Sequence, residues 1–243
     1  MYNHKQSVKE VIRHLSFRCG LAVTHDMVRR WHGRRAEHMR MKTIPDIFSK
    51  IYEDNVWVEK MEQENLSGVG STKDATSDLV VQLASFLRDV ECRQLVDIGC
   101  GDFNWMQNVE GDFNYLGIDV VPQLIEAHQA RYANDKRRFI CMDATLSAIP
   151  SGDVAICREV LFHLSFRDGL LLLNNIKAAG FKYVLLTHDV SIWFNSDIRS
   201  GDFRLINLTI SPYRLCKPMY QLRDEKVSVG RTLSVWPGEV LPG

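Results

Sequence analysis

One short stretch constrains the fold of this chain more than any other: residues 95–105, with the sequence LVDIGCGDFNW. A run of Val, Ile and Leu that closes on glycine is typical of a buried parallel strand, because such a strand is covered on both faces and needs no polar alternation. Gly99 and Gly101 let the backbone turn sharply and let a ligand lie against it, and the amides of the next helix face that ligand. The stretch therefore predicts a strand, a tight turn and a nucleotide-type cofactor site.

Further apolar runs with the length of strands alternate with helical segments along the chain. They cover residues 115–119, 137–143, 153–159 and 183–187. Pro122 suits the first turn of a helix, and Ser165 with Asp168 has capping-box spacing. Because parallel neighbours need crossover connections, this alternation predicts an α/β fold with a doubly wound, mostly parallel sheet.

The last part of the chain has a different pattern. Residues 219–224 and 231–236 are strand-like and are separated by a short polar turn that contains Gly230. This spacing favours an antiparallel pair at the sheet edge. With the five runs before it, the pair predicts a seven-stranded sheet of the Rossmann-like kind.

Length and charge divide the chain into two parts. Its 243 residues suffice for one large α/β domain, which we expect over residues 46–243. Residues 1–45 are expected to form a basic helical N-terminal arm, since residues 1–42 hold ten Lys or Arg and three Asp or Glu. The RRWHGRR run at residues 29–35 could bind phosphate, a membrane surface or a nucleic acid, but the favoured interpretation is a solvated helical arm that packs through its few apolar residues.

Residues 47–71 are the start of the larger domain and contain a candidate lid. Ile47, Ile51 and Val58 give an apolar helical stripe, and SGVGS at residues 67–71 then supplies two glycines between hydroxyl residues. The segment is either an ordinary loop or a lid whose amides and hydroxyls reach over a cofactor.

Cysteine usage and hydropathy bear on the compartment. The six cysteines never reach C-x-x-C spacing, so they resemble small core residues in a reducing compartment and predict neither disulfides nor a metal site. No apolar stretch approaches the ~20 residues of a membrane helix, and the first residues lack the apolar segment of a signal peptide. We expect a cytoplasmic protein without a membrane span.

Three acids close the first three strands of the sheet: Asp97, Asp119 and Asp143. They should meet at the carboxyl edge, where open α/β sheets bind ligands. Twenty residues separate Gly99 from Asp119, the interval that lets a carboxylate accept the ribose hydroxyls of an adenosine whose tail lies on the glycine turn. A dinucleotide fingerprint would have a third glycine where this chain has Asn104. Asp97 would repel a pyrophosphate but suits a cation, and S-adenosylmethionine combines adenosine with a cationic tail.

The order of these motifs resembles class I S-adenosylmethionine-dependent methyltransferases over about residues 67–236: D-I-G-C-G, G-I-D, M-D-A, and a strand with C-R-E and H-L. The resemblance implies that Asp97, Gly99 and Gly101 hold the methionine part, that Asp119 holds the ribose and that Asp143 accepts a hydrogen bond from the adenine amino group. Helix capping is the alternative role for these acids. The further cofactor contacts that the resemblance implies are Cys100, Asn104, Trp105, Val120, Ala144 and Arg158.

Finer features are similar to a bacterial group of these enzymes associated with sugar and glycan modification. They are the SGVGS segment, CGDFNWM at residues 100–106, CREVLFHLSF at residues 157–166 and NSDIRSGDFRLINL at residues 195–208. The resemblance implies methyl transfer to a hydroxyl of a small polar acceptor, a sugar or glycan.

A hydroxyl acceptor loses its proton as the new bond forms, which requires a base or a metal. Arg158, Glu159 and His163 stand just past the fourth strand, where this fold places the acceptor side of the pocket. His163 is the candidate base. A packed core histidine and a simple Arg158 to Glu159 ion pair are the structural alternatives.

Five polar or aromatic residues are candidates for binding the acceptor. Sugar hydroxyls need several fixed hydrogen-bond partners, and a tryptophan offers a flat apolar face. A loop closed by its own Asx turns would explain most of these residues as well. The candidates are Trp57, His188, Asn195, Arg204 and Asn207.

Other functions follow from the same residues. An amine or carboxylate of a small metabolite is a possible acceptor. No N-P-P-Y-like sequence and no Pro-Cys pair follows the fourth strand, which argues against methylation of nucleic acid bases. A non-catalytic binding module, with the basic arm on RNA, would show degraded cofactor motifs, whereas here they look intact.

Overall fold

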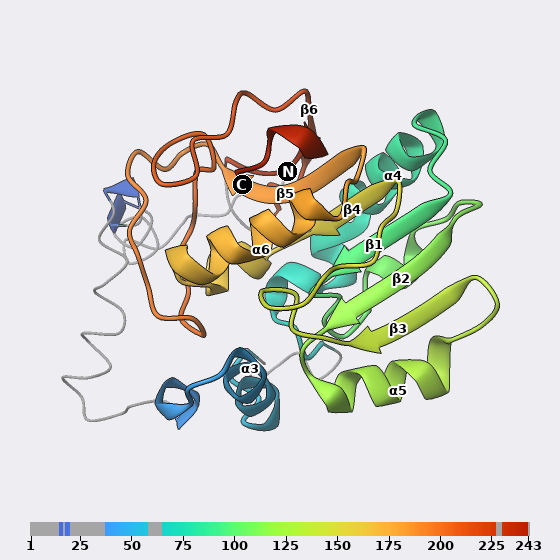
Figure 1. Cartoon of the computed structure of the whole chain (residues 1–243), viewed down its shortest axis with the longest axis horizontal. Coiled ribbons are helices and arrows are strands. Elements are labelled where there is room, and N and C mark those ends of the chain that lie inside the picture. The colour runs from blue at the N-terminus through green and yellow to red at the C-terminus, as the bar shows by residue number, and fades with distance from the viewer. Residues whose placement is uncertain (1–14, 17, 20–36, 58–64, 227–229, 243) are drawn as a thin grey trace.

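The computed structural model describes residues 15–16, 18–19, 37–57, 65–226 and 230–242 (Figure 1). The basic run at residues 29–35, Val58 and most of the predicted N-terminal arm lie outside the described residues.

A seven-stranded sheet with the order β3-β2-β1-β4-β5-β7-β6 forms the centre of the molecule. Neighbours among β1 to β5 pair in parallel, whereas β7 is antiparallel to both β5 and β6. This confirms the predicted doubly wound sheet with an antiparallel edge pair. The strands are β1 Gln94–Ile98, β2 Asn114–Asp119, β3 Arg137–Cys141, β4 Val154–Cys157, β5 Tyr183–Asp189, β6 Tyr220–Arg223 and β7 Arg231–Pro237.

Four α-helices accompany the sheet in the described part of the chain: α3 Ile44–Glu53, α4 Lys73–Asp89, α5 Pro122–Tyr132 and α6 Phe166–Ala178. Figure 1 shows α6 in front of the sheet and α4 behind it. The start signals in the sequence act as predicted, since the Ser165 side chain accepts a hydrogen bond from the Asp168 amide and Pro122 is the first residue of α5. None of the described helices is both long and apolar enough to cross a bilayer.

Two apolar clusters cover the two faces of the sheet. Val96 and Ile98 of β1 belong to a cluster with α6 and α3, whereas Leu95 packs in a second cluster with α4. The first strand is therefore buried on both sides, which fixes the position of its carboxyl end and of the turn that follows.

Residues 190–219 connect β5 to β6 without a helix or strand. This connection lies on the carboxyl side of β5, the same side as the turn after β1. Its backbone amides and carbonyls therefore need hydrogen-bond partners outside the sheet. Several predicted site residues supply these hydrogen bonds, which decides their role.

Candidate functional site

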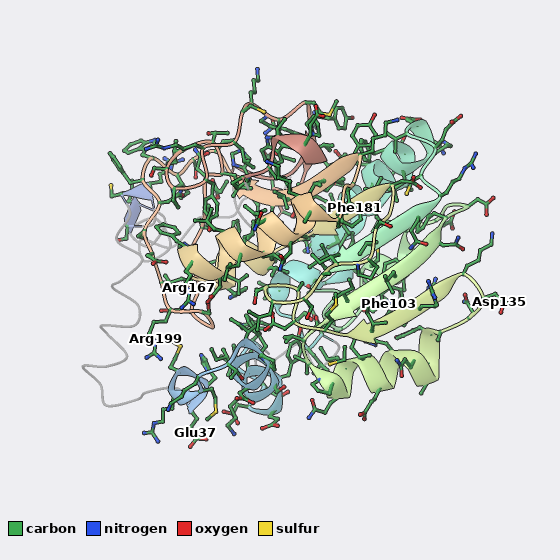
Figure 2. The ribbon with its side chains drawn as sticks, viewed as in Figure 1. Glu37, Phe103, Asp135, Arg167, Phe181 and Arg199 are labelled. Carbon is green, nitrogen blue, oxygen red and sulfur yellow. The ribbon has the colours of Figure 1, made fainter. Side chains whose placement is uncertain are left out.

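The turn after β1 needs glycine at two positions. Gly99 and Gly101 have φ values of +76° and +55°, in the left-handed region that favours glycine. A Cβ on Gly99 would lie 2.2 Å from Val160 Cγ2, and one on Gly101 would lie 2.6 Å from Ser67 Oγ. Phe103 anchors the turn, because its ring is buried and packs against Tyr115 of β2 and Phe139 of β3. Figure 2 labels Phe103 beside these two strands.

A cleft of about 930 Å³, including its open mouth, lies at the carboxyl ends of β1, β2 and β4. Most of the predicted site residues line it. From the predicted set, the lining includes Trp57, Asp97, Gly99, Cys100, Gly101, Trp105, Asp119, Val120, Asp143, Ala144, Arg158, Glu159 and His163.

Asp119 ends β2 and organises the glycine turn. Its Oδ2 accepts a hydrogen bond from the Gly101 amide at 2.9 Å, and its Oδ1 accepts one from the Val121 amide at 3.1 Å. Burial raises the pKa of Asp119, while these backbone amides oppose that rise. Each carboxylate oxygen keeps a second lone pair, so the group can still accept two hydroxyl donors from the cleft.

Asp97 lies in β1, directly beneath the cleft. The Tyr115 hydroxyl donates a 2.7 Å hydrogen bond to its Oδ2. Burial raises the pKa of Asp97 to about 7, with repulsion from Asp119 adding to the rise and the Tyr115 hydrogen bond opposing it. A carboxyl group with that pKa would bind a cation by losing its proton.

Asp143 follows β3 and has one oxygen without a protein partner. Its Oδ1 accepts hydrogen bonds from the backbone amide and the hydroxyl of Thr145, at 2.9 and 2.6 Å. Its Oδ2 is buried and has no hydrogen-bond partner in the described protein. A buried carboxylate oxygen needs a donor, so the cleft is suited to a ligand that brings an N–H group to this point.

The predicted lid segment is tied to the glycine turn. Ser67 Oγ accepts a hydrogen bond from the Asp102 amide and lies 2.8 Å from the Tyr52 hydroxyl of α3. Asn104 was expected to contact the cofactor, but it does not line the cleft. Its side chain instead donates to the Ser71 carbonyl, which joins this segment to the turn.

Arg158 and Glu159 do not pair with each other. Arg158 binds Asp224 at 3.0 and 2.9 Å, and Glu159 lies 3.2 Å from Arg231. The alternative of a simple Arg158 to Glu159 pair is therefore wrong, because the β6–β7 hairpin brings Asp224 and Arg231 to both side chains. Glu159 has a φ of +68°, which strains a residue with a side chain.

His163 lies on the cleft wall between two aromatic rings. Its ring centroid is 4.8 Å from that of Trp57 and 5.4 Å from that of Phe203. Nδ1 lies 2.9 Å from the Asp202 carbonyl oxygen, and because a carbonyl only accepts, Nδ1 carries the proton. Burial lowers the pKa of His163 to about 4, so at neutral pH the ring holds one proton and Nε2 can accept another.

The structure places four of the five acceptor-binding candidates away from the lining of the cleft. None of the four lines the cleft, and each hydrogen-bonds to backbone groups nearby. The amides and carbonyls of these loops have no neighbouring strand to bind, so they need hydrogen bonds from side chains. This explains why the four side chains point toward the protein interior. His188 accepts from the Leu208 amide, Asn195 binds Asn207 and Ser211, Arg204 donates to the Leu161 and Leu164 carbonyls, and Asn207 donates to the Ile192 carbonyl.

Several cleft-related residues were not predicted. The parallel register places Asp97 opposite Gly117, so Tyr115, two residues earlier, shares the face of Asp97. Because side chains alternate between the two faces of a strand, the register of β1 and β2 is enough to predict that Tyr115 lies near Asp97. Asp224 and Arg231 gave no local signal, because their role depends on the pairing of β6 with β7.

The hydrogen-bond acceptors and the acidic group of the cleft fit an adenosyl sulfonium compound. Such a ligand brings ribose hydroxyls, an exocyclic amine and a positive charge. Asp119 has acceptor capacity, Asp143 Oδ2 lacks a donor, and Asp97 is poised to become an anion. Gly99 and Gly101 add backbone without side chains to the cleft wall.

Comparison with known proteins agrees with this geometry. Residues 96–177 match the family model for a methyltransferase domain. The fold is similar to magnesium protoporphyrin IX methyltransferase from Synechocystis with bound S-adenosylmethionine, with a TM-score of 0.52, 11% identity, and 80% of this chain and 97% of that chain covered. It is also similar to mitomycin 7-O-methyltransferase, with a TM-score of 0.50 and 16% identity over 67% of this chain and 54% of that chain. The comparison with curated proteins found no relative.

Proposed function

We propose that this S-adenosylmethionine-dependent methyltransferase methylates a hydroxyl group of a small polar acceptor, a sugar or glycan, with His163 as the general base. One observation carries the proposal. The Asp202 carbonyl holds the proton on Nδ1 of His163, which leaves Nε2 as a proton acceptor on a residue of the cleft wall.

The cofactor, when bound, supplies an electrophilic methyl group. The work of the chain is to align the acceptor with it and to exclude water. Asp97, Asp119 and Asp143 would hold the cationic tail, the ribose and the adenine amine. Arg158, fixed by Asp224 and placed 5.1 Å from the Trp105 ring centroid, would border the tail.

His163 would take the acceptor proton during transfer. Its pKa of about 4 keeps the imidazole neutral at pH 7, so the base is available without prior deprotonation. A hydroxyl becomes strongly acidic as its oxygen forms the new bond, and a weak base within hydrogen-bond reach then suffices. The Asp202 carbonyl would stabilise the imidazolium that results.

Trp57 and Glu159 support a sugar as the acceptor. A sugar ring presents C–H groups on its faces and hydroxyls around its edge. The Trp57 indole packs beside His163, and Glu159 brings a carboxylate to the same cleft, with 23% of its side chain exposed. The four candidates outside the cleft lining do not contribute to this assignment.

The first test is His163→Gln. Turnover should fall about 10² to 10⁴-fold, the usual contribution of a positioned base, while the cofactor dissociation constant measured by calorimetry stays unchanged. His188→Gln is the matched control, since its ring also has a pKa lowered to about 4 by burial but lies away from the cleft. Wild-type turnover in the His163 variant would reject it as the base.

The second test identifies the acceptor. The protein is incubated with methyl-labelled cofactor and panels of nucleotide sugars, glycans, amines and carboxylic acids, and products are read by mass spectrometry. A labelled O-methyl sugar would support the proposal. Labelled amine or ester products alone would contradict it.

A further inference from the structure

The connection after β5 begins with an exposed apolar tip. Trp193 and Phe194 are adjacent and are 60% and 66% exposed, and Val190 is 52% exposed. Residues 190–196, VSIWFNS, carry no charged side chain. Two neighbouring aromatic rings in water are costly unless they meet a partner, so the tip has the character of a contact surface.

The tip lies at the same sheet edge as the cleft. It follows the carboxyl end of β5, which runs parallel to β4, and Glu159 follows the carboxyl end of β4. The same connection continues into the segment that holds His163, since the Gly201 amide donates to the His163 carbonyl at 2.8 Å. A partner bound to the tip would therefore be close to the acceptor side of the cleft.

The N-terminal region meets the tip. The Trp193 amide donates a 3.2 Å hydrogen bond to the Arg18 carbonyl, and the described part of a short helical turn, residues 15–16 and 18–19, lies beside the connection (Figure 1). Leu15 of that turn is itself 49% exposed. Residues 1–42, to which the turn belongs, carry ten Lys or Arg and only three Asp or Glu.

We propose that this tip, Val190 to Phe194 with residues 15–16 and 18–19 of the neighbouring turn, docks the enzyme on an anionic lipid bilayer. Trp and Phe insert at the interface between headgroups and acyl chains, and the basic N-terminal sequence adds attraction to anionic headgroups. Aliphatic side chains at Val190 and Leu15 suit acyl chains better than nucleic acid bases. A second copy of the chain carries the same strongly basic N-terminal sequence, so charge does not favour its binding here.

Co-sedimentation of the full chain with vesicles tests the proposal. The wild type should pellet with phosphatidylcholine vesicles that contain phosphatidylglycerol, less with pure phosphatidylcholine, and less as NaCl rises, since salt screens the headgroup attraction. The double variant Trp193→Ala, Phe194→Ala should bind about tenfold or more weakly, because both insertions are lost.

A matched double variant controls for the loss of exposed apolar surface in general. Val81 and Leu146 are 70% and 78% exposed and lie on α4 and after β3, away from the tip. Val81→Ala, Leu146→Ala should bind vesicles like the wild type, and calorimetry should show equal cofactor binding in all three proteins. That readout separates a failure of docking from a failure of the methyltransferase assignment.

Three outcomes would overturn the proposal. One is a wild type that does not pellet with anionic vesicles, and another is equal binding by the Trp193, Phe194 double variant. The third is loss of self-association or of RNA binding in that variant without any vesicle binding by the wild type, which would assign the tip to another partner.

Discussion

Two regions border the same edge of the sheet, and their polar residues point in opposite directions. At the ends of β1 to β3, the carboxylates of Asp97, Asp119 and Asp143 all line the cleft. In the connection after β5, Asn195 and Arg204 turn inward and bind the backbone. Residue type alone predicts ligand contacts in both regions. The side chains differ in direction because the two backbones differ in how many hydrogen bonds they need from side chains.

The turns at the strand ends use only part of the hydrogen-bonding capacity of these carboxylates. The backbone of β1 and β2 is satisfied largely by neighbouring strands. Asp119 and Asp143 also accept hydrogen bonds from backbone amides of the turns that follow, but each keeps acceptor capacity for a ligand. The Asp97 carboxyl accepts from a side chain, the Tyr115 hydroxyl. The connection after β5 has no ladder, and its amides and carbonyls must find partners before the loop can be buried. A polar side chain in an irregular buried segment therefore hydrogen-bonds to the backbone first. Only its remaining hydrogen-bonding capacity is available to a ligand.

The inward-pointing region still acts on the site, but indirectly. The Arg204 amide donates to the Phe162 carbonyl, the Gly201 amide donates to the His163 carbonyl, and the Asp202 carbonyl fixes the His163 ring. The connection thus positions the proposed base, whereas the strand ends would contact the cofactor itself.

Asp119→Ala should give the largest effect on cofactor binding. We expect the affinity for S-adenosylmethionine to fall about 100-fold, because hydrogen bonds from two ribose hydroxyls to a charged group are lost. Calorimetry measures the affinity. Asp112→Ala is the control, because its side chain is 91% exposed and lies far from the cleft in the loop before β2. Near-normal binding by the Asp119 variant would mean that Asp119, like Asn195 and Arg204, binds the backbone and does not contact the cofactor.

Gly99→Ala tests the strand-end turn against a matched glycine. Gly180 has almost the same φ, +75° against +76°, but a Cβ there would meet nothing within 4 Å. Both variants should lose about 1 kcal/mol of unfolding free energy from the left-handed backbone. Only Gly99→Ala adds the clash with Val160, and its cofactor affinity should fall about tenfold or more. Equal effects in both variants, measured by urea unfolding and calorimetry, would show that space at Gly99 does not matter.

The pH dependence of cofactor binding sharpens the role of Asp97. A cation prefers the carboxylate, so a pKa of about 7 in the free protein means that affinity rises as the pH is raised through 7. Between pH 6 and pH 8 the deprotonated fraction grows about tenfold, and the affinity should follow. Calorimetry in two buffers of different ionisation enthalpy should also detect proton release near pH 7.

Two variants control this pH effect. Asp97→Asn cannot titrate and should bind weakly with no rise through pH 7. Tyr115→Phe removes the hydrogen bond that opposes the rise in pKa, so the midpoint should move to higher pH. A midpoint that stays in place in both variants would show that another group controls the pH dependence.

How far the sequence predicts this molecule follows from the same contrast. The sheet and the three carboxylates could be predicted, because periodicity fixes the strands and parallel topology brings their carboxyl ends together. Asn195 and Arg204 could not be assigned correctly, since their partners are carbonyls and amides of a loop whose path is set by distant contacts. Asp224 and Arg231 were missed for a related reason, because a hairpin far along the chain delivers them to Arg158 and Glu159.

Asn195→Ala should give the smallest effect on function and so completes the comparison. Asn195 makes three backbone hydrogen bonds, donating to the Asn207 and Ser211 carbonyls and accepting from the Asn207 amide. Losing them leaves loop groups unsatisfied, which costs about 1–3 kcal/mol and should lower the melting temperature by about 2–10 °C in a chain of this size. The KM for the acceptor, measured well below the melting temperature, should not change. A raised KM with an unchanged melting temperature would mean that the loop contacts the acceptor after all, and the two regions would then share one role.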